Sequence, residues 1–373
     1  MNGGNMRKVE DIFIEMIKID SESGSEKRFV NYLKDEFGKL GLECIKDIAS
    51  IEKTGSDAPN LIVKLKGQKT DKTCIGFSAH VDTVVPGKDI KPILDGDVIK
   101  SSGNTILGSD DKSGIAAILH AAMRIKEENI PSRDAMFIFT TSEEVGLLGA
   151  KHLDTSLIEG LENMIVLDSG GPFGEIITSA PSQNSIKMKV KGKAAHAGLE
   201  PEKGLNAIFA VSKGIANTKI GRIDDETTSN IGTIRGGKAT NIVPDLVEFE
   251  GEVRSRDDNK LKKVTEEMIS SIQKEVKECG CEFEYEVIPE YKAYNIPNDH
   301  ELVKEIINVG KKMGVDIKTG STGGGSDTNI HCENGINAVN MSTGMMNVHT
   351  TSEHIHIEDL KKTSEFIFNI LTN

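Results

Sequence analysis

Four short apolar segments in the first half of the chain constrain its fold more than any other feature. They read LIVKLKG, TCIGFSAH, MFIFTT and MIVLDSG and begin at positions 61, 73, 136 and 164. Apolar runs of this length, bounded by polar residues, are typical of buried strands. Between the second and third segments, apolar residues at helical spacing predict a helix: Ile115, Ile118, Leu119, Ala122 and Ile125. Strands alternating with helices predict an α/β domain with a mostly parallel sheet flanked by helices.

The pattern changes between about residues 181 and 291. Ile186, Met188 and Val190 alternate as in a half-exposed strand, and apolar residues from Leu261 to Val276 mark a long amphipathic helix. The predicted order in this region is β-α-β-β-α-β, which is typical of a ferredoxin-like α+β unit. We therefore expect a discontinuous catalytic domain, residues 1–180 and 295–373, with residues 181–294 forming an inserted small domain.

Composition excludes several classes of function. The chain carries 45 Lys and Arg against 58 Asp and Glu, a formal net charge of −13, which argues against nucleic acid or an anionic membrane as partner. No apolar run approaches the roughly 20 residues that span a bilayer, and a secretory signal is not expected. The five cysteines are scattered and odd in number, which favours a reducing compartment. A cytoplasmic protein is the expectation.

Acidic residues and a histidine follow the predicted strands. His80 and Glu143 stand close to two strand ends, and further acids stand nearby: Asp82, Asp110, Asp111, Glu144 and Asp168. Each alone has an ordinary explanation, because Asp commonly caps helices and H-x-D is a weak motif. Together they should meet at the carboxyl edge of the sheet, where open α/β folds bind ligands. Unpaired acids would repel one another there, so we expect divalent cations, and imidazole with carboxylates suits zinc.

These residues belong to motifs that recur in one enzyme family. The motifs are HVDTV (80–84), GSDDKSG (108–114), TSEEVGLLGA (141–150), LDSGGP (167–172), AHAGLEPEKGLNAI (195–208) and NVHTTSEHI (347–355). As a set and in this order they resemble the dizinc peptidase family that includes peptidase T, carboxypeptidase G, aminoacylase and succinyl-diaminopimelate desuccinylase. GSDDKSG and LDSGGP are most similar to the peptidase T branch.

The resemblance implies roles for individual residues. Two divalent ions per subunit, zinc with cobalt or manganese as alternatives, would be held by His80, Asp111, Glu144, Asp168 and His349. Asp111 would bridge the ions, its neighbour Asp110 would be structural, and Asp82 would orient the His80 ring. Glu143 would be the general base for a water whose pKa two cations lower from about 16 toward about 7.

The inserted domain and a later loop supply further candidates. The resemblance implies a lid and homodimerisation role for this domain, with His196 as an oxyanion donor in a partner's active site. Asn241 and Arg254 would bind substrate, and Gly324, Gly325 and Ser326 could offer backbone N–H groups to it. Each of these candidates could also have an ordinary structural role: His196 as an exposed turn residue, Arg254 as a strand-end residue, and the glycines as a flexible turn.

The resemblance implies an exopeptidase that releases the N-terminal residue of short peptides, with tripeptides as the expected substrates because the motifs are most similar to the peptidase T branch. An N-acyl amino acid deacylase with the same metals and base is the alternative, and a catalytically inactive metal-binding or peptide-binding relative is a third. Neither a phosphate-binding loop nor a G-x-S-x-G nucleophile elbow occurs in the sequence.

Overall fold

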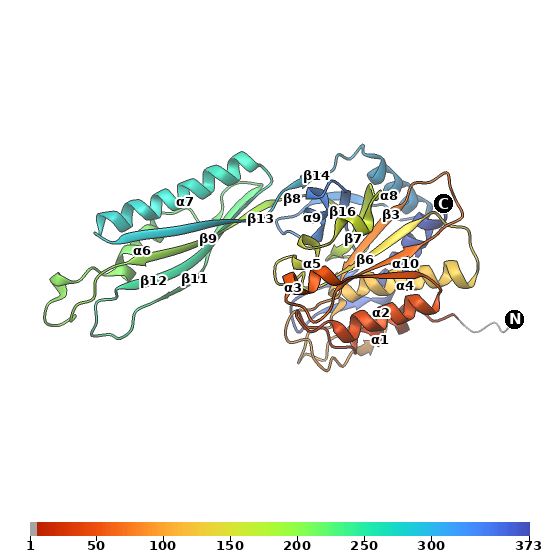
Figure 1. Cartoon of the computed structure of the whole chain (residues 1–373), viewed down its shortest axis with the longest axis horizontal. Coiled ribbons are helices and arrows are strands. Elements are labelled where there is room, and N and C mark those ends of the chain that lie inside the picture. The colour runs from red at the N-terminus through yellow and green to blue at the C-terminus, as the bar shows by residue number, and fades with distance from the viewer. Residues whose placement is uncertain (1–5) are drawn as a thin grey trace. The chain divides into compact units, whose positions relative to one another are not determined.

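A computed structural model describes residues 6–373 of the chain. The chain divides into two compact units. The first comprises the chain up to Thr178 together with Asn295–Ser321 and Ser326–Asn373, and the second comprises Ser179–Tyr294 with Thr322–Gly325. Figure 1 labels many of the helices and strands of both units. None of the helices in the described part of the chain is long and apolar enough to cross a membrane.

The first unit is built on a mixed sheet whose centre is parallel. Its strand order is β1 (Glu43–Asp47), β2 (Asn60–Leu65), β6 (Ala135–Thr140), β3 (Ile75–His80), β7 (Asn163–Ser169), β16 (Asn337–Ser342), β8 (Glu175–Ala180) and β14 (Tyr294–Asn295), with β15 (Lys318–Ser321) beside β8. Strands β6, β3, β7 and β16 run parallel to one another. Their carboxyl ends therefore meet at one edge of the sheet.

Helices flank this sheet. They are α1 (Val9–Ile17), α2 (Lys27–Lys39), α3 (Ile51–Thr54), α4 (Ser109–Glu127), α5 (Leu148–Lys151), α8 (Glu301–Lys312), α9 (Asp327–Glu333) and α10 (Ile357–Thr372), with short 3-10 turns η1 (Ile48–Ser50) and η2 (Thr155–Ile158). Helix α4 packs on β3 and β7 and is itself contacted by α1 and α10. Helix α9 contacts β16 and α5. The predicted α/β layer with a mostly parallel sheet is confirmed.

A small antiparallel sheet lies within the same unit. Its strand order is β17 (Met345–Met346), β18 (His354–His356), β5 (Val98–Lys100) and β4 (Ile93–Asp95). It joins the loop before α4 to the segment that carries His349, because β18 pairs with β5. Two segments far apart in sequence are thus fixed beside each other.

The second unit is an antiparallel sheet covered by helices. Its strand order is β10 (Gly221–Arg222), β11 (Thr227–Gly236), β12 (Leu246–Ser255), β9 (Ser182–Lys191) and β13 (Glu282–Tyr291). Helices α6 (Ala207–Ala216) and α7 (Asp258–Glu278) pack on the sheet, and η3 (Pro201–Lys203) precedes α6. Apart from the short β10, this is the expected β-α-β-β-α-β order.

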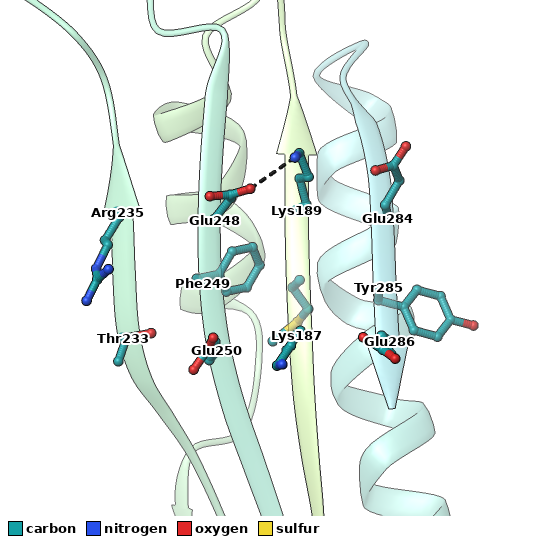
Figure 2. A pocket seen from close by; sticks show the side chains of 11 residues that line it. Lys187, Lys189, Thr233, Arg235, Glu248, Phe249, Glu250, Glu284, Tyr285 and Glu286 are labelled. Carbon is teal, nitrogen blue, oxygen red and sulfur yellow. Dashed lines mark ion pairs between the residues drawn. The ribbon is translucent and has the colours of Figure 1, made fainter. Parts of the chain in front are cut away.

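Side chains of alternating charge line a pocket on this sheet (Figure 2). Lys189 lies opposite Glu248 on one neighbouring strand and Glu284 on the other, and its Nζ is 3.0 Å from Glu248 Oε1. Lys187 is placed in the same way between Glu250 and Glu286. Opposite charges directly across a sheet are mutually stabilising, so each lysine in these rows stabilises the pairing of three strands.

Candidate metal centre

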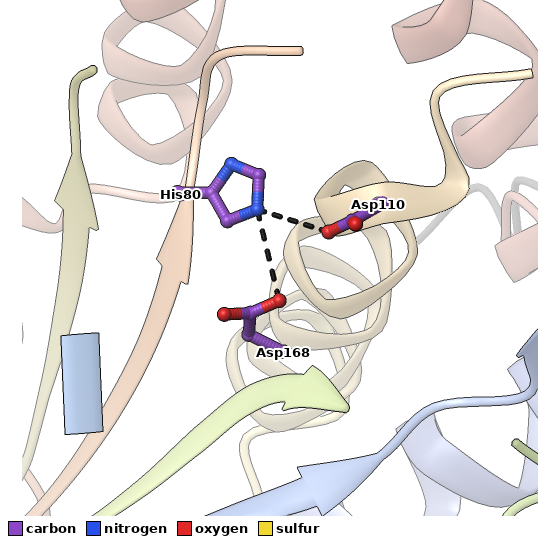
Figure 3. A group of neighbouring side chains, drawn as sticks. All are labelled: His80, Asp110 and Asp168. Carbon is purple, nitrogen blue, oxygen red and sulfur yellow. Dashed lines mark hydrogen bonds and ion pairs between the residues drawn. The ribbon is translucent and has the colours of Figure 1, made fainter. Parts of the chain in front are cut away.

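His80 and two aspartates meet at the carboxyl edge of the parallel strands. His80 is the last residue of β3 and is buried, whereas Asp168 lies near the end of β7. The His80 Nε2 atom is 3.0 Å from Asp110 Oδ1 and 3.7 Å from Asp168 Oδ1 (Figure 3). Three potential ligand atoms therefore face one another at the place where parallel strands end.

Asp110 also contacts the second histidine of the site. His349 Nε2 lies 3.1 Å from Asp110 Oδ2 and 3.0 Å from Glu144 Oε1. Asp110 thus offers one carboxylate oxygen to each histidine, the arrangement that a carboxylate shared by two ions requires. The expectation that Asp110 is merely structural is contradicted by this geometry.

Asp111, the residue expected to bridge, is placed differently. Its side chain is fully buried, and among residues 6–373 its carboxylate belongs to none of the groups of potential metal-ligand atoms. One of its oxygens lies close to Gly114, where an added Cβ would meet it at 2.8 Å. The prediction for Asp111 is therefore corrected to Asp110, because the sequence shows two adjacent aspartates but not which carboxylate faces the histidines.

Potential ligand atoms form three overlapping groups, and within each group they lie within 4.8 Å of one another. The groups are His80 with Asp110 and Asp168, His80 with Glu143 and Glu144, and Asp110 with Glu144 and His349. The first and third share Asp110. The arrangement therefore suits a pair of cations, one near each histidine.

The electrostatics of the site fit a cation. Burial, and repulsion by nearby carboxylates, raises the pKa of Asp168 to about 7 and that of Glu143 well above its ordinary value. Hydrogen bonds to Asp110 and Glu144 raise the pKa of His349 to about 10. Without metal, protons partly neutralise this crowded negative charge. Divalent ions would do the same, and the mixture of carboxylate and imidazole donors suits zinc.

Asp82 connects the histidine to the pair of glutamates. The His80 Nδ1 atom is 2.9 Å from the carbonyl oxygen of Asp82 and 3.5 Å from its Oδ1. The Asp82 carboxylate accepts hydrogen bonds from the backbone N–H groups of Glu143, at 2.9 Å, and Glu144, at 3.2 Å. The ring is thus oriented mainly by the carbonyl, while the carboxylate holds the turn that carries both glutamates.

Glu353, four residues after His349, is a structural support of the site. Its buried carboxylate accepts hydrogen bonds from four successive backbone N–H groups, those of residues 107–110, at 2.6 to 3.2 Å. The loop that presents Asp110 is therefore fixed by the same segment that carries His349. Asp327, in the sequence GGGSD, is a second buried acid that was missed; burial raises its pKa to about 6, and Thr140 donates a hydrogen bond to it.

His196 and Asn241 lie on adjoining loops of the second unit. The Ala197 N–H donates to the Asn241 carbonyl at 2.9 Å, and His196 forms a bridge with Ile242. The Gly198 N–H donates to His196 Nδ1 at 3.2 Å, which leaves Nε2 as the protonated nitrogen of a neutral ring. The exposed His196 side chain can therefore act as a hydrogen-bond donor.

Arg254 is already paired within the second unit. Its Nε and Nη2 atoms contact the two oxygens of Glu252 at 3.0 and 2.9 Å, and its Nη1 is 3.4 Å from the Tyr291 hydroxyl. Burial would lower the pKa of Arg254, but the bond to Glu252 raises it. A carboxylate ligand would therefore have to share this guanidinium with Glu252.

The glycine-rich loop was expected to offer the backbone N–H groups of Gly324, Gly325 and Ser326 to substrate, but two of these groups already have partners. The Gly324 N–H already donates to Thr322 Oγ1, and the Ser326 N–H donates to Asn329 Oδ1 as part of a helix capping box. These two groups are therefore not substrate donors in this structure. Gly325 is required by packing, because an added Cβ would meet the Tyr291 ring at 2.2 Å.

Comparisons with known proteins agree with this architecture. A family model described as peptidase family M20/M25/M40 matches residues 76–373. The aminopeptidase PepT of Bacillus cereus ATCC 10987 is 39% identical, with a TM-score of 0.91 over 99% of this chain and 98% of its own. A tripeptidase of Staphylococcus aureus subsp. aureus Mu50 is 34% identical, with a TM-score of 0.94 over 99% and 98%.

A relative of similar length has no stated activity. The uncharacterized protein YqjE of Bacillus subtilis (strain 168) is 40% identical over 367 residues, which are 98% of each chain. The match to the family model covers most of the chain, including every residue grouped around His80 and His349. The chain is a hydrolase of the peptidase class and belongs to peptidase family M20/M25/M40.

Proposed function

We propose that this protein is a dimetal exopeptidase that releases the N-terminal residue of short peptides, tripeptides in particular. The observation that carries the proposal is the Asp110 carboxylate, which lies within 3.1 Å of one histidine and 3.0 Å of the other. The choice of substrate is supported by the likeness to a PepT aminopeptidase and a tripeptidase across nearly the whole chain.

The proposed ligands divide into two sets that share one residue. His80 and Asp168 would hold one ion, Glu144 and His349 the other, and Asp110 would contact both. We propose zinc, with cobalt and manganese as alternatives, because imidazole and carboxylate are donors that all three accept. Bound ions would supply a water of lowered pKa and polarise the scissile carbonyl.

Glu143 is the proposed general base. Its side chain is buried beside His80 and Glu144, and burial with repulsion by Asp168 raises its pKa well above the usual range. A carboxylate with raised basicity can take a proton from water and return it to the leaving amine. Glu144, whose oxygen lies 3.0 Å from His349, serves as the ligand and leaves its neighbour free for proton transfer.

The second unit is proposed as a lid and homodimerisation domain. The β11 residues 230–236 have no strand on their outer side among the described residues, since β10 pairs only with Thr228 and Ser229. The same unit carries exposed apolar side chains: Ile208, Phe209, Ile220 and Ile234. A second copy of the chain would cover such an edge. We propose that His196 then donates to the oxyanion in the partner's site, and that Asn241 and Arg254 contact substrate.

A cytoplasmic location is part of the same proposal. All five cysteines are free in the structure, which suits a reducing compartment. Short peptides are available there as substrates, so no further partner is required.

A matched pair of peptides tests the substrate class. The purified protein, loaded with zinc, is incubated with a free tripeptide and with the same tripeptide acetylated at its N-terminus. Release of the first residue from the free peptide alone is the expected result. A preference for the acetylated peptide would move the assignment to the N-acyl amino acid deacylases. Release of the C-terminal residue instead would contradict the aminopeptidase direction.

A further inference from the structure

The segment between α1 and α2 contacts the strand-end loop that follows His80. Thr83 donates its N–H to the Ser21 carbonyl at 2.9 Å, and the Ser23 N–H donates to the Thr83 carbonyl at 3.2 Å. Glu22 and Thr83 form a parallel bridge at this point. The backbone of residues 21–23 is therefore fixed to the loop that carries Asp82.

Side chains of the same segment reach two active-site turns. The Ser23 hydroxyl donates to Asp82 Oδ2 at 2.7 Å. The Lys112 ammonium, two residues after Asp110, donates to the Ile19 carbonyl at 2.7 Å from a buried position. The contacts of residues 19–23 thus extend to both the Asp82 loop and the Asp110 loop.

Glu26 makes a third connection, to the turn before the proposed base. Its side chain is fully buried, and Oε1 accepts hydrogen bonds from the Ser142 N–H at 3.2 Å and the Ser142 hydroxyl at 3.1 Å. Its other oxygen accepts a bond from the Ser56 hydroxyl at 2.7 Å. The carboxylate therefore joins the start of α2 to the residue that precedes Glu143.

The turn at Ser142 needs such a restraint. Ser142 has a φ of 55°, in the left-handed region that is unfavourable for residues other than glycine. Such a conformation persists only where surrounding contacts impose it. The N–H groups of three consecutive residues are held here by two buried carboxylates, Ser142 by Glu26, and Glu143 and Glu144 by Asp82.

We propose that Glu26 is a positioning residue that fixes the direction of the Glu143 carboxylate by holding Ser142 in its left-handed conformation. This inference rests on the proposed function, in which Glu143 is the general base. Glu26 precedes residues 76–373, the part of the chain that the family model matches. The role proposed for Glu26 is supported by geometry alone. Its buried carboxylate is bound to Ser142, the residue directly before the proposed base.

The test compares two substitutions at Glu26 with one matched substitution at Glu36. Glu26→Leu removes both acceptors with little change of volume, whereas Glu26→Gln keeps one acceptor oxygen for Ser142. Glu36 lies on α2, which begins one residue after Glu26; it is also buried and is paired with Arg7 at 2.6 Å, so Glu36→Leu controls for loss of a buried carboxylate. For each variant kcat, KM, bound metal and melting temperature are measured.

Glu26→Leu is expected to lower kcat about 100-fold, because a shift of about 1 Å in a catalytic group has that effect. KM should stay within about twofold and two ions should remain bound, because the Glu144 N–H is still held by Asp82. Glu26→Gln should recover most of kcat. Glu36→Leu should lower the melting temperature and leave kcat unchanged.

A double variant shows whether Glu26 acts through Glu143. Glu26→Leu combined with Glu143→Gln should be no slower than Glu143→Gln alone, because two residues that act as a unit are not additive. Normal kcat in Glu26→Leu, beside an inactive Glu143→Gln, would refute the inference and leave the proposed function intact. An active Glu143→Gln would instead refute the base assignment. If Glu26→Leu does not fold, Ser142→Ala removes the bond from the Ser142 hydroxyl to the same carboxylate, and unchanged kcat in that folded variant would refute the inference.

Discussion

Substitution of Asp110 is the sharpest test of the site, because sequence and geometry favour different aspartates. Asp110→Ala removes the carboxylate whose oxygens lie 3.0 Å from His80 Nε2 and 3.1 Å from His349 Nε2. Each of two bound ions would lose one ligand. Asp111→Asn neutralises the neighbouring buried carboxylate, which belongs to none of the three groups of potential ligand atoms among residues 6–373. Comparing the two variants therefore shows which of the two aspartates is the bridging ligand.

The expected magnitude follows from the number of ligands. Zinc binding to four protein ligands is worth about 10–16 kcal/mol, so one ligand contributes roughly 3 kcal/mol. A loss of that size corresponds to a weakening of about 100-fold in the affinity for each ion. Asp110→Ala should therefore weaken both sites, whereas Asp111→Asn, which keeps the shape of the side chain, should change either affinity by less than about tenfold.

Titration calorimetry of zinc into metal-free protein measures both affinities in one experiment. Circular dichroism of the same samples shows whether each variant is folded. Two ions bound at wild-type affinity by Asp110→Ala would refute the bridging role. A folded Asp111→Asn protein that lost both ions would restore the assignment made from sequence.

Three further outcomes are expected. Glu143→Gln should keep two ions and lose at least about 100-fold in kcat, the usual effect of removing a general base, and near-normal turnover would contradict its role. Zinc binding at pH 7 should release protons, because the pKa of His349 is about 10 in the metal-free site, above its unfolded value near 6.5. This ring is therefore protonated at pH 7, and calorimetry in buffers of different ionisation enthalpy should find about one proton fewer for His349→Gln; equal release would contradict the ligand assignment. Mixed dimers of His196→Ala and Glu143→Gln should regain part of the activity if His196 works across an interface, and no recovery after subunit exchange would place it within its own chain.

The α/β layer was predictable because its strands are short apolar runs buried on both faces. β3 and β6 have few or no exposed residues, so their sequences lack alternation but end abruptly in polar groups. The inserted unit was equally visible, since β9 alternates and α7 buries one apolar stripe. Its share of the glycine-rich loop, Thr322–Gly325, was not visible, because that assignment depends on packing against a residue as distant as Tyr291.

The sequence could not show which residue occupies a position in the site where that depends on the orientation of a side chain. Residue types showed that acids gather at strand ends, but two neighbours in a turn can point in different directions, and Asp110 and Asp111 do so. The Glu26 contact was also beyond the sequence, because it joins residues 116 positions apart. The N–H groups of Gly324 and Ser326, expected to face substrate, donate to local side chains in the structure, a competition that the sequence did not reveal.

Glu353 also has a consequence for how the protein is made. Its carboxylate holds residues 107–110, which are synthesised 243 to 246 positions earlier. His349 belongs to the same late segment. During translation the first strands and α4 can collapse long before either residue exists, with the acids around His80 crowded and uncompensated. A nascent chain therefore cannot acquire its full complement of metal on the ribosome until the inserted unit has been made and the Glu353 segment has emerged.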